Sequence, residues 1–415
     1  MALHHRTTGH HRTTGRLRLR LGGSATFLGL TALVLSGCGV FTTPEPGAVR
    51  DTSLAPPGSM GYVACPDQVT PVELATHTAE PAIQLPLSAT PALGDYAVAA
   101  SPDGRWAYLV TSDGVMSSST SSARARPAGG ATAGRRSLTI PPAGVGVQNV
   151  VVPINLVTQQ AGAPIRIPGQ GGTHAIVVLA GGRTVLAASG STIVPIDTAT
   201  RRVGASLDLG PGRTIFGMVV VPGRPVLYAL VAGGVFVVDT AHRTAGVEIP
   251  TGLSVSSVYS PHGIAINATG ATVFVVGQGG ADFGGRVLPI DTATGIAGTA
   301  TGFDSFGIAD PAAAAVTPDG SSVLVVDSAN NWVNPVPLAT FTDPPAPVRI
   351  PPATDGGASA GTQHPTDIVV GPGREGAFIV DGFSSVIPYQ PVSHSFGRPI
   401  PVCTGDSSMT VAPTP

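Results

Sequence analysis

One ten-residue phrase occurs twice in this 415-residue chain with six consecutive residues, PIDTAT, unchanged, and looser copies recur along most of the chain's length. The two similar copies are "VPIDTATRRV" from Val194 and "LPIDTATGIA" from Leu288. Five more copies begin, with drift, at Thr70, Val152, Phe236, Asn334 and Ile387. Each copy starts with apolar residues suited to a β-strand and then enters a polar turn, in which Asp and Thr side chains bond to nearby backbone. A chain with seven such copies is predicted to fold as an array of similar units.

A second pattern predicts a β-hairpin ahead of each later copy: an apolar run, a Gly or Pro-Asp-Gly turn, and another apolar run. Examples are "YAVAASPDGRWAYLV" from Tyr96 and "AAAAVTPDGSSVLVVD" from Ala312. The turn glycines of these hairpins are Gly104, Gly182, Gly223, Gly270, Gly320 and Gly373. Two hairpins in roughly every 40–50 residues are typical of a four-stranded β-propeller blade. The first interval is longer because it holds a low-complexity, Arg-containing insert at 115–147, which we interpret as a solvated, disordered-type loop.

Composition agrees with an all-β fold. The 55 glycines and 40 prolines are more turn formers than a helical protein tolerates. The predicted strands are near-continuous apolar runs, as expected of sheets covered on both faces by neighbouring blades.

The number of repeats predicts how the ring closes. There are seven third-strand phrases but only six complete first hairpins, so we expect the last blade to combine both chain ends. Its inner strand is predicted at about 408–412, and its outer three at about 62–64, 69–74 and 82–87. The fold class predicted is therefore all-β: a seven-bladed propeller over 61–415 with four-stranded antiparallel blades, the last closed by N- and C-terminal strands that leave no open edge.

The cysteines support this closure independently. Cys65 follows the second strand of the shared blade and Cys403 precedes its first strand. Antiparallel pairing places these two ends on the same rim, which predicts a disulfide between them. Two unpaired buried cysteines are the alternative.

The first 37 residues are predicted to be a lipoprotein signal peptide. Five arginines precede an apolar stretch at 24–35, which is too short to span a bilayer but suits a signal-peptide core. The following Leu35-Ser36-Gly37-Cys38 resembles the bacterial lipobox, which implies cleavage before Cys38 and lipid, including palmitate, on its thiol. Residues 38–60 are predicted to be the lipidated cysteine and a flexible tether. The expected location is the extracytoplasmic face of the cell membrane.

The repeats "VPIDTATRRVG" and "SPDGRWAYLV" are similar to the YVTN-type β-propeller repeat of exported bacterial proteins. Ala107-Tyr108-Leu109-Val110-Thr111 is a loose version of that family's second strand, and the other blades drift further. The resemblance covers about 61–415. It implies the architecture but no particular activity, because propellers carry many unrelated sites.

Candidate ligand-binding residues lie just before the predicted inner strands, at the mouth of the central channel. They are His174, His262, His364, Asp95, Asp310, Asp367 and Asp406. In a four-stranded blade these positions share a face with every long connection, so any binding surface is expected there. Converging histidines and carboxylates can hold a divalent metal or act as general acid and base. Equally, they can cap strand ends and bond to loop backbone.

Two enzyme hypotheses follow if these residues hold a metal or act as general acid and base. Pro261-His262-Gly263 resembles a motif of the metal-dependent streptogramin-lyase propellers. The calcium-dependent lactonase propellers need a Glu and an Asn or Asp deep in the channel, but here no predicted inner strand carries Glu, and only Asn267 and Asp367 compare. We therefore favour a binding or scaffolding module without a cofactor, and keep a metal-dependent lyase or lactonase as the alternative.

The expected partners are the membrane, reached through the lipid, and an envelope protein or glycan. Without the leader, 17 arginines face 24 acidic residues, a formal net charge of −7 that gives no support for nucleic-acid binding. We expect a monomer. The sequence names no substrate.

Overall fold

The computed structural model describes residues 59–87, 96–113, 148–169, 172, 175–255, 263–279, 284–302, 310–341, 346–352, 364–371, 376–382, 384–403 and 407–412. They belong to one compact unit that spans 51–415. The predicted signal peptide, Cys38, the tether up to residue 58 and the insert at 115–147 lie outside the described residues. Among the described residues, no helix has the length and apolar character needed to cross a membrane.

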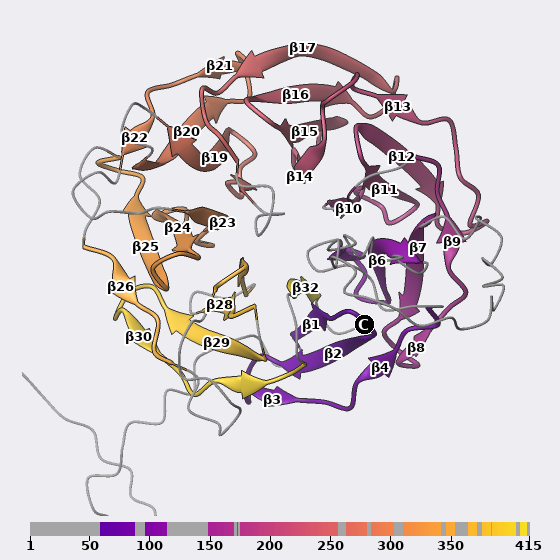
Figure 1. Cartoon of the computed structure of the whole chain (residues 1–415), viewed down its shortest axis with the longest axis horizontal. Coiled ribbons are helices and arrows are strands. Elements are labelled where there is room, and N and C mark those ends of the chain that lie inside the picture. The colour runs from indigo at the N-terminus through magenta and orange to yellow at the C-terminus, as the bar shows by residue number, and fades with distance from the viewer. Residues whose placement is uncertain are drawn as a thin grey trace, which may run out of the picture. The chain divides into compact units, whose positions relative to one another are not determined.

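The described strands form seven antiparallel sheets arranged as the blades of a propeller (Figure 1). This confirms the predicted fold class. The inner strands, one per blade, are β5 (Tyr96–Ala100), β10 (Ile176–Val178), β14 (Ile215–Val220), β18 (Ile264–Ile266), β23 (Pro311–Val316), β27 (Asp367–Val370) and β32 (Ser408–Ala412). The second strands are β6 (Trp106–Asp113), β11 (Thr184–Ser189), β15 (Val226–Val231), β19 (Thr272–Gly279), β24 (Ser322–Asp327), β28 (Ala377–Val380) and β1 (Met60–Ala64). We number the blades 1 to 7 in this order.

Each third strand ends at the fourth residue of the repeated phrase, and in five blades the last two residues of the phrase begin an outer strand. The third strands are β7 (Gln148–Asn155), β12 (Thr192–Asp197), β16 (Gly234–Asp239), β20 (Gly284–Asp291), β25 (Trp332–Pro337), β29 (Ser385–Gln390) and β2 (Gln68–Glu73). The outer segments are β8 (Gln160–Ala161), β9 (Ile165–Arg166), β13 (Leu207–Asp208), β17 (Thr244–Pro250), β21 (Ile296–Ala297), β22 (Thr301–Gly302), β26 (Val348–Arg349), β30 (Ser395–Phe396), β31 (Ile400–Pro401), β3 (Thr78–Ala79) and β4 (Ile83–Gln84).

Blade 7 is shared between the two ends of the chain, as the sequence predicts. Its sheet order is β3-β2-β1-β32, with β4 also pairing with β2. The strands β1 and β32 pair along five residues, from Met60 opposite Ala412 to Ala64 opposite Ser408. In Figure 1 the yellow β32 lies beside the indigo β1 on the inner side of the ring. Blade 7 therefore closes the ring.

The hydrophobic core is divided among the boundaries between blades. Seven clusters of buried residues each combine side chains of two neighbouring blades, and the boundaries of blade 7 with blades 1 and 6 are included. Second and third strands are buried on both faces, as β11 illustrates: Val185 packs against blade 1 and Ala188 against blade 3, and neither has exposed surface. Because the clusters run all the way round, closure of the ring completes two of the seven.

Candidate functional site

Of the seven candidate channel-mouth residues, three are described: Asp310, His364 and Asp367. Asp310 directly precedes β23, His364 lies three residues before β27, and Asp367 is the first residue of β27. His174, His262, Asp95 and Asp406 lie outside the described residues. The three described side chains take part in one polar arrangement, which we call the rim network. It consists of Asp310, Asp327, Ser328, His364, Thr366, Asp367, Asp381, Ser385 and Ser407.

In blade 5 the rim network is organised by Asp327, which is fully buried at the end of β24. Its Oδ1 accepts hydrogen bonds from the backbone N–H groups of Asp310 (3.3 Å) and Ala329 (3.0 Å). Ser328 donates through its hydroxyl to Asp310 Oδ2 at 3.0 Å. His364 extends the network to the next blade, because its Nδ1 donates to the Ser328 carbonyl at 3.0 Å. These bonds fix the start of β23 against the loop after β24.

In blade 6 the corresponding carboxylate is Asp381, which is 2% exposed and follows β28. Its Oδ1 accepts from the backbone N–H groups of Ser384 and Ser385, both at 2.9 Å, and its Oδ2 accepts from the Ser385 hydroxyl. Its carbonyl accepts from the His364 N–H. A buried carboxylate needs such donors, because an unpaired buried charge is costly. Asp381 therefore shapes the turn between β28 and β29.

Asp367 connects blade 6 to the closing strand. It is 1% exposed, its Oδ1 accepts from the N–H of Ile368 at 2.8 Å, and its Oδ2 accepts from the N–H of Met409 in β32 at 2.9 Å. One residue earlier, the Thr366 hydroxyl donates to the Ser407 carbonyl at 2.9 Å. Two side chains that open β27 therefore hold the beginning of β32 beside it.

Sequence reasoning did not identify Asp327 and Asp381 as members of this arrangement. Both end a second strand and begin a short polar segment, "DSANN" and "DGFSS", which is an Asx-turn signal. This signal could have identified both residues, because the connection between second and third strands lies on the same face as the starts of the inner strands.

The described residues include no group of three or more His, Cys, Asp or Glu side chains placed to hold a metal ion. The described members of the rim network bond to backbone and hydroxyl groups. Asp310, His364 and Asp367 therefore have the strand-capping role that the sequence left open as the alternative to ligand binding. Asn267, the other side chain weighed for lactonase chemistry, lies in the β18–β19 turn, where its Oδ1 accepts from the N–H groups of Ala271 (2.9 Å) and Thr272 (3.2 Å). It supports that turn.

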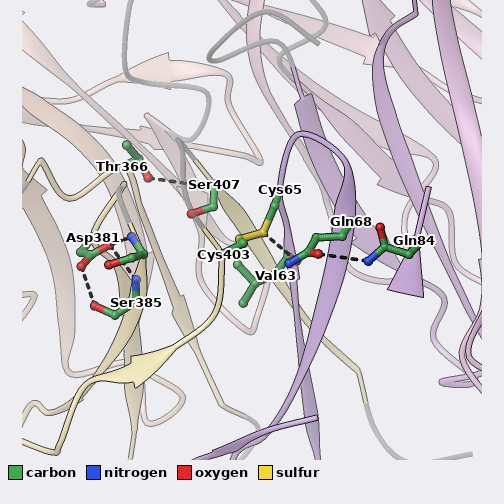
Figure 2. The surroundings of a disulfide bond; sticks show 10 residues. Val63, Cys65, Gln68, Gln84, Thr366, Asp381, Ser385, Cys403 and Ser407 are labelled. Atoms are coloured by element: carbon green, nitrogen blue, oxygen red, sulfur yellow. Dashed lines mark hydrogen bonds between the residues drawn. A yellow bond between two sulfur atoms is a disulfide. The ribbon is translucent and has the colours of Figure 1, made fainter. Parts of the chain in front are cut away.

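Cys65 and Cys403 form a disulfide, with their Cα atoms 6.3 Å apart. This confirms the predicted staple. Figure 2 shows the bond beside the β1–β2 turn, where the Gln84 amide donates to Gln68 Oε1, with Asp381 and Ser385 in the adjoining blade. Both cysteines pack in the cluster between blades 6 and 7. The disulfide and the rim network therefore act on the same part of the ring.

On the opposite face, where the connections are short turns, a pocket of about 350 Å³ lies between blades 1 and 2. Its lining includes Asp103 and Trp106 from blade 1, and Thr198 and Arg201 from blade 2. A smaller pocket of about 200 Å³ lies at the corresponding place between blades 5 and 6, where Asp319 and Pro391 are among the lining residues.

Comparison with solved structures supports the propeller fold. The chain is similar to hydrazine synthase of Kuenenia stuttgartiensis, with a TM-score of 0.57, 13% sequence identity, and coverage of 78% of this chain and 91% of that chain. It is also similar to a functionally unknown protein from Desulfotomaculum acetoxidans, with a TM-score of 0.55, 11% identity, and coverage of 86% and 99%. At these identities the likeness concerns the fold alone. No protein-family model matches the sequence, and a search of curated proteins finds no match.

Proposed function

We propose that this protein is a lipid-anchored β-propeller that acts as a binding or scaffolding module on the extracytoplasmic side of the cell membrane. The observation that carries the proposal is the disulfide between Cys65 and Cys403. Disulfides persist in oxidising compartments, so this bond supports export. The chain has three cysteines, and the third, Cys38, ends the lipobox-like Leu35-Ser36-Gly37-Cys38.

The use of the rim carboxylates supports binding over catalysis. Asp327, Asp367 and Asp381 are each 2% exposed or less and accept hydrogen bonds from backbone N–H groups. Groups used in this way stabilise loops and strand ends. A rigid ring with a stapled closure is suited to presenting the long connections of one face to an envelope partner.

The anchor is tested by metabolic labelling. The full chain, expressed in a bacterium that processes lipoproteins, should incorporate an alkyne analogue of palmitate and fractionate with membranes. Cys38→Ser should abolish the label, whereas the double variant Cys65→Ser/Cys403→Ser should retain it. A wild-type chain without label, or a Cys38→Ser chain with it, would contradict the anchor.

Photo-cross-linking in cells tests the proposed binding face. Ser254 and Thr294 are both exposed, the first on the long-connection face and the second in a short turn. A benzophenone amino acid at position 254 should form a discrete adduct that the same group at position 294 does not form. Equal labelling from both positions, or none from 254, would contradict this assignment.

Elemental analysis of the purified full chain separates binding from metal-dependent catalysis. We expect well below one equivalent of divalent metal. One equivalent that is lost in His364→Gln and Asp367→Asn would overturn the proposal and support the lyase or lactonase alternative.

A further inference from the structure

The pocket between blades 1 and 2 is large enough to hold a small ligand. Its volume of about 350 Å³ falls within the range of ligand sites in proteins. It lies on the short-turn face, away from the rim network. Blade 1 contributes Asp103 and Trp106 at its first hairpin turn, and blade 2 contributes Thr198 and Arg201 from its polar turn.

The corresponding pocket between blades 5 and 6 shows what the fold alone produces. It is smaller, about 200 Å³, and is lined by the matching Pro-Asp-Gly turn, including Asp319. Ser322 stands where blade 1 has Trp106, and Pro391 stands where blade 2 has Thr198. Its described lining residues include neither an aromatic side chain nor an arginine.

A third pocket, between blades 2 and 3, is lined by Arg243, which has the turn position of Arg201, but its volume is only about 80 Å³ and its described lining residues include no aromatic side chain. Among these three pockets, the one between blades 1 and 2 is therefore the one whose described lining combines an aromatic side chain with an arginine.

Two opposite charges face this pocket. Asp103 accepts hydrogen bonds at Oδ1 from the Ser101 hydroxyl (2.6 Å) and the Arg105 N–H (3.1 Å), and these bonds lower its pKa. The positive charge of Arg105 also lowers this pKa, and both hydrogen bonds end on Oδ1. The guanidinium of Arg201 forms no ion pair with any described residue. It lies against Gly162 of blade 1, where any side chain larger than hydrogen would bring a Cβ within 3.4 Å of Arg201 Nη2.

The remaining lining combines an aromatic ring with hydroxyl groups. Trp106 is half-buried and packs against the core between blades 1 and 2, so part of its ring is available to the pocket. Tyr108 is 4% exposed, and burial raises the pKa of its hydroxyl, whereas the Thr198 side chain lowers that pKa. The same pKa responds to Asp103 and Arg201, which shows that both charges lie within electrostatic reach of it.

We propose that this pocket binds a carbohydrate unit, with one pyranose ring lying on Trp106. A sugar ring has an apolar face for the indole and adjacent hydroxyls that donate to Asp103 Oδ2 and accept from Arg201. A neutral polyol can hydrogen-bond to Asp103 and to Arg201 at the same time, whereas a simple anion or cation would pair with only one of the two. This inference goes beyond the proposed function, because it concerns the opposite face and holds whether or not Cys38 carries lipid.

At Arg201, one substitution can remove the positive charge without disturbing the fold. Its φ is 56°, and the same turn position in blade 4 is Gly295 with φ 68°. Glycine is the residue best suited to this backbone conformation. Arg201→Gly should therefore remove the guanidinium at no cost in folding. His394→Gly, at the same turn position of blade 6 with φ 54°, is the matched control.

The test uses the full chain carrying Trp332→Phe, which leaves Trp106 as its only tryptophan. Glucose, galactose, mannose, N-acetylglucosamine and their disaccharides are titrated while Trp106 emission is recorded. We expect at least one sugar to give a saturable change with a dissociation constant in the millimolar range or tighter. Arg201→Gly and Asp103→Asn should each weaken binding about tenfold or more, and His394→Gly should leave it unchanged.

Three results would overturn the proposal. They are the absence of a saturable response to any sugar, equal weakening by Arg201→Gly and His394→Gly, and saturation by zwitterionic amino acids without saturation by sugars. Thermal melting of each variant accompanies the titration, so that lost binding is distinguished from lost folding.

Discussion

The eighth residue of every repeated phrase adopts the left-handed backbone conformation. These residues are His77, Gln159, Arg201, Arg243, Gly295, Phe341 and His394, with φ between 37° and 68°. The turn is held by the fourth residue, as where Asp197 Oδ1 accepts from the N–H of Thr200 at 2.7 Å. A side chain at positive φ costs about 1–2 kcal/mol, so six of the seven blades contain this strain and blade 4 does not.

Exchange of residues at that position should change stability in opposite directions. Gln159→Gly relieves the strain, and because glycine also makes the unfolded chain more flexible, the expected net gain is about 0.5–1 kcal/mol. Gly295→Gln should cost a similar amount. Urea denaturation of both variants measures this, and a loss of stability in Gln159→Gly together with no change in Gly295→Gln would contradict it.

An exposed ion pair in blade 3 should make the stability of its turn depend on pH. His242 Nδ1 lies 2.8 Å from Asp239 Oδ2. The hydrogen bond first, and the negative charge second, raise the pKa of His242 above 6.5. Because the folded-state pKa is raised, the stabilisation is fully present below pH 6.5 and is lost as the pH rises through the folded-state pKa.

NMR titration of the His242 ring checks the direction of this shift. The midpoint should lie above 6.5 and return to about 6.5 in Asp239→Asn. Asp197→Asn, the same position in blade 2, is the control and should leave the His242 midpoint unchanged. A wild-type midpoint at or below 6.5 would refute the pair.

At the scale of strands, a proline explains the broken outer edge of most blades. Pro153 interrupts the pairing of β7, since β8 bonds on one side of it and β9 on the other. Prolines take the same second position of the phrase in every blade except blade 3, which has Val237. There β17 is one seven-residue strand, although its pairing with β16 shifts register between Phe236 and Val238. Proline lacks the N–H that an outer strand would need.

The same effect marks the limit of the sequence analysis. The repeats predicted the blades, the shared blade and the disulfide, because each depends on counting and order along the chain. One outer strand was predicted at 82–87, but the structure has the short β3 and β4 on either side of Pro71. The contacts of Asp367 with β32 depend on side-chain direction across 42 residues, which strand patterns do not contain. For Asp95, His174, His262 and Asp406 the mouth site remains a prediction.

Asp367 should be one of the more important side chains for the contact between β27 and β32. Asp367→Ala leaves the buried N–H groups of Ile368 and Met409 without this acceptor, at a cost of about 1–3 kcal/mol for each group. We expect a loss of about 2–6 kcal/mol in chemical denaturation. Asp197→Asn, which is exposed, should change stability by less than about 0.5 kcal/mol. Equal effects of the two substitutions would contradict the role of Asp367.

For the whole molecule, closure of the ring makes the chain suitable for circular permutation. Met60 and Ala412 are opposite each other in the β1–β32 pair, so an Asn-Gly linker can join them as a two-residue hairpin. A permutant with this linker, opened between Pro211 and Gly212 in the turn before β14, should unfold cooperatively. One opened between Tyr228 and Ala229, inside β15, should not fold. Failure of both permutants would contradict the closure.

Peptide mapping under non-reducing conditions shows whether the two ends of the chain build one blade. We expect the peptides containing Cys65 and Cys403 to be recovered as one cross-linked species from a single chain, and separately after reduction. Recovery of both cysteines as free thiols, or linked between two chains, would contradict the closed seven-bladed ring.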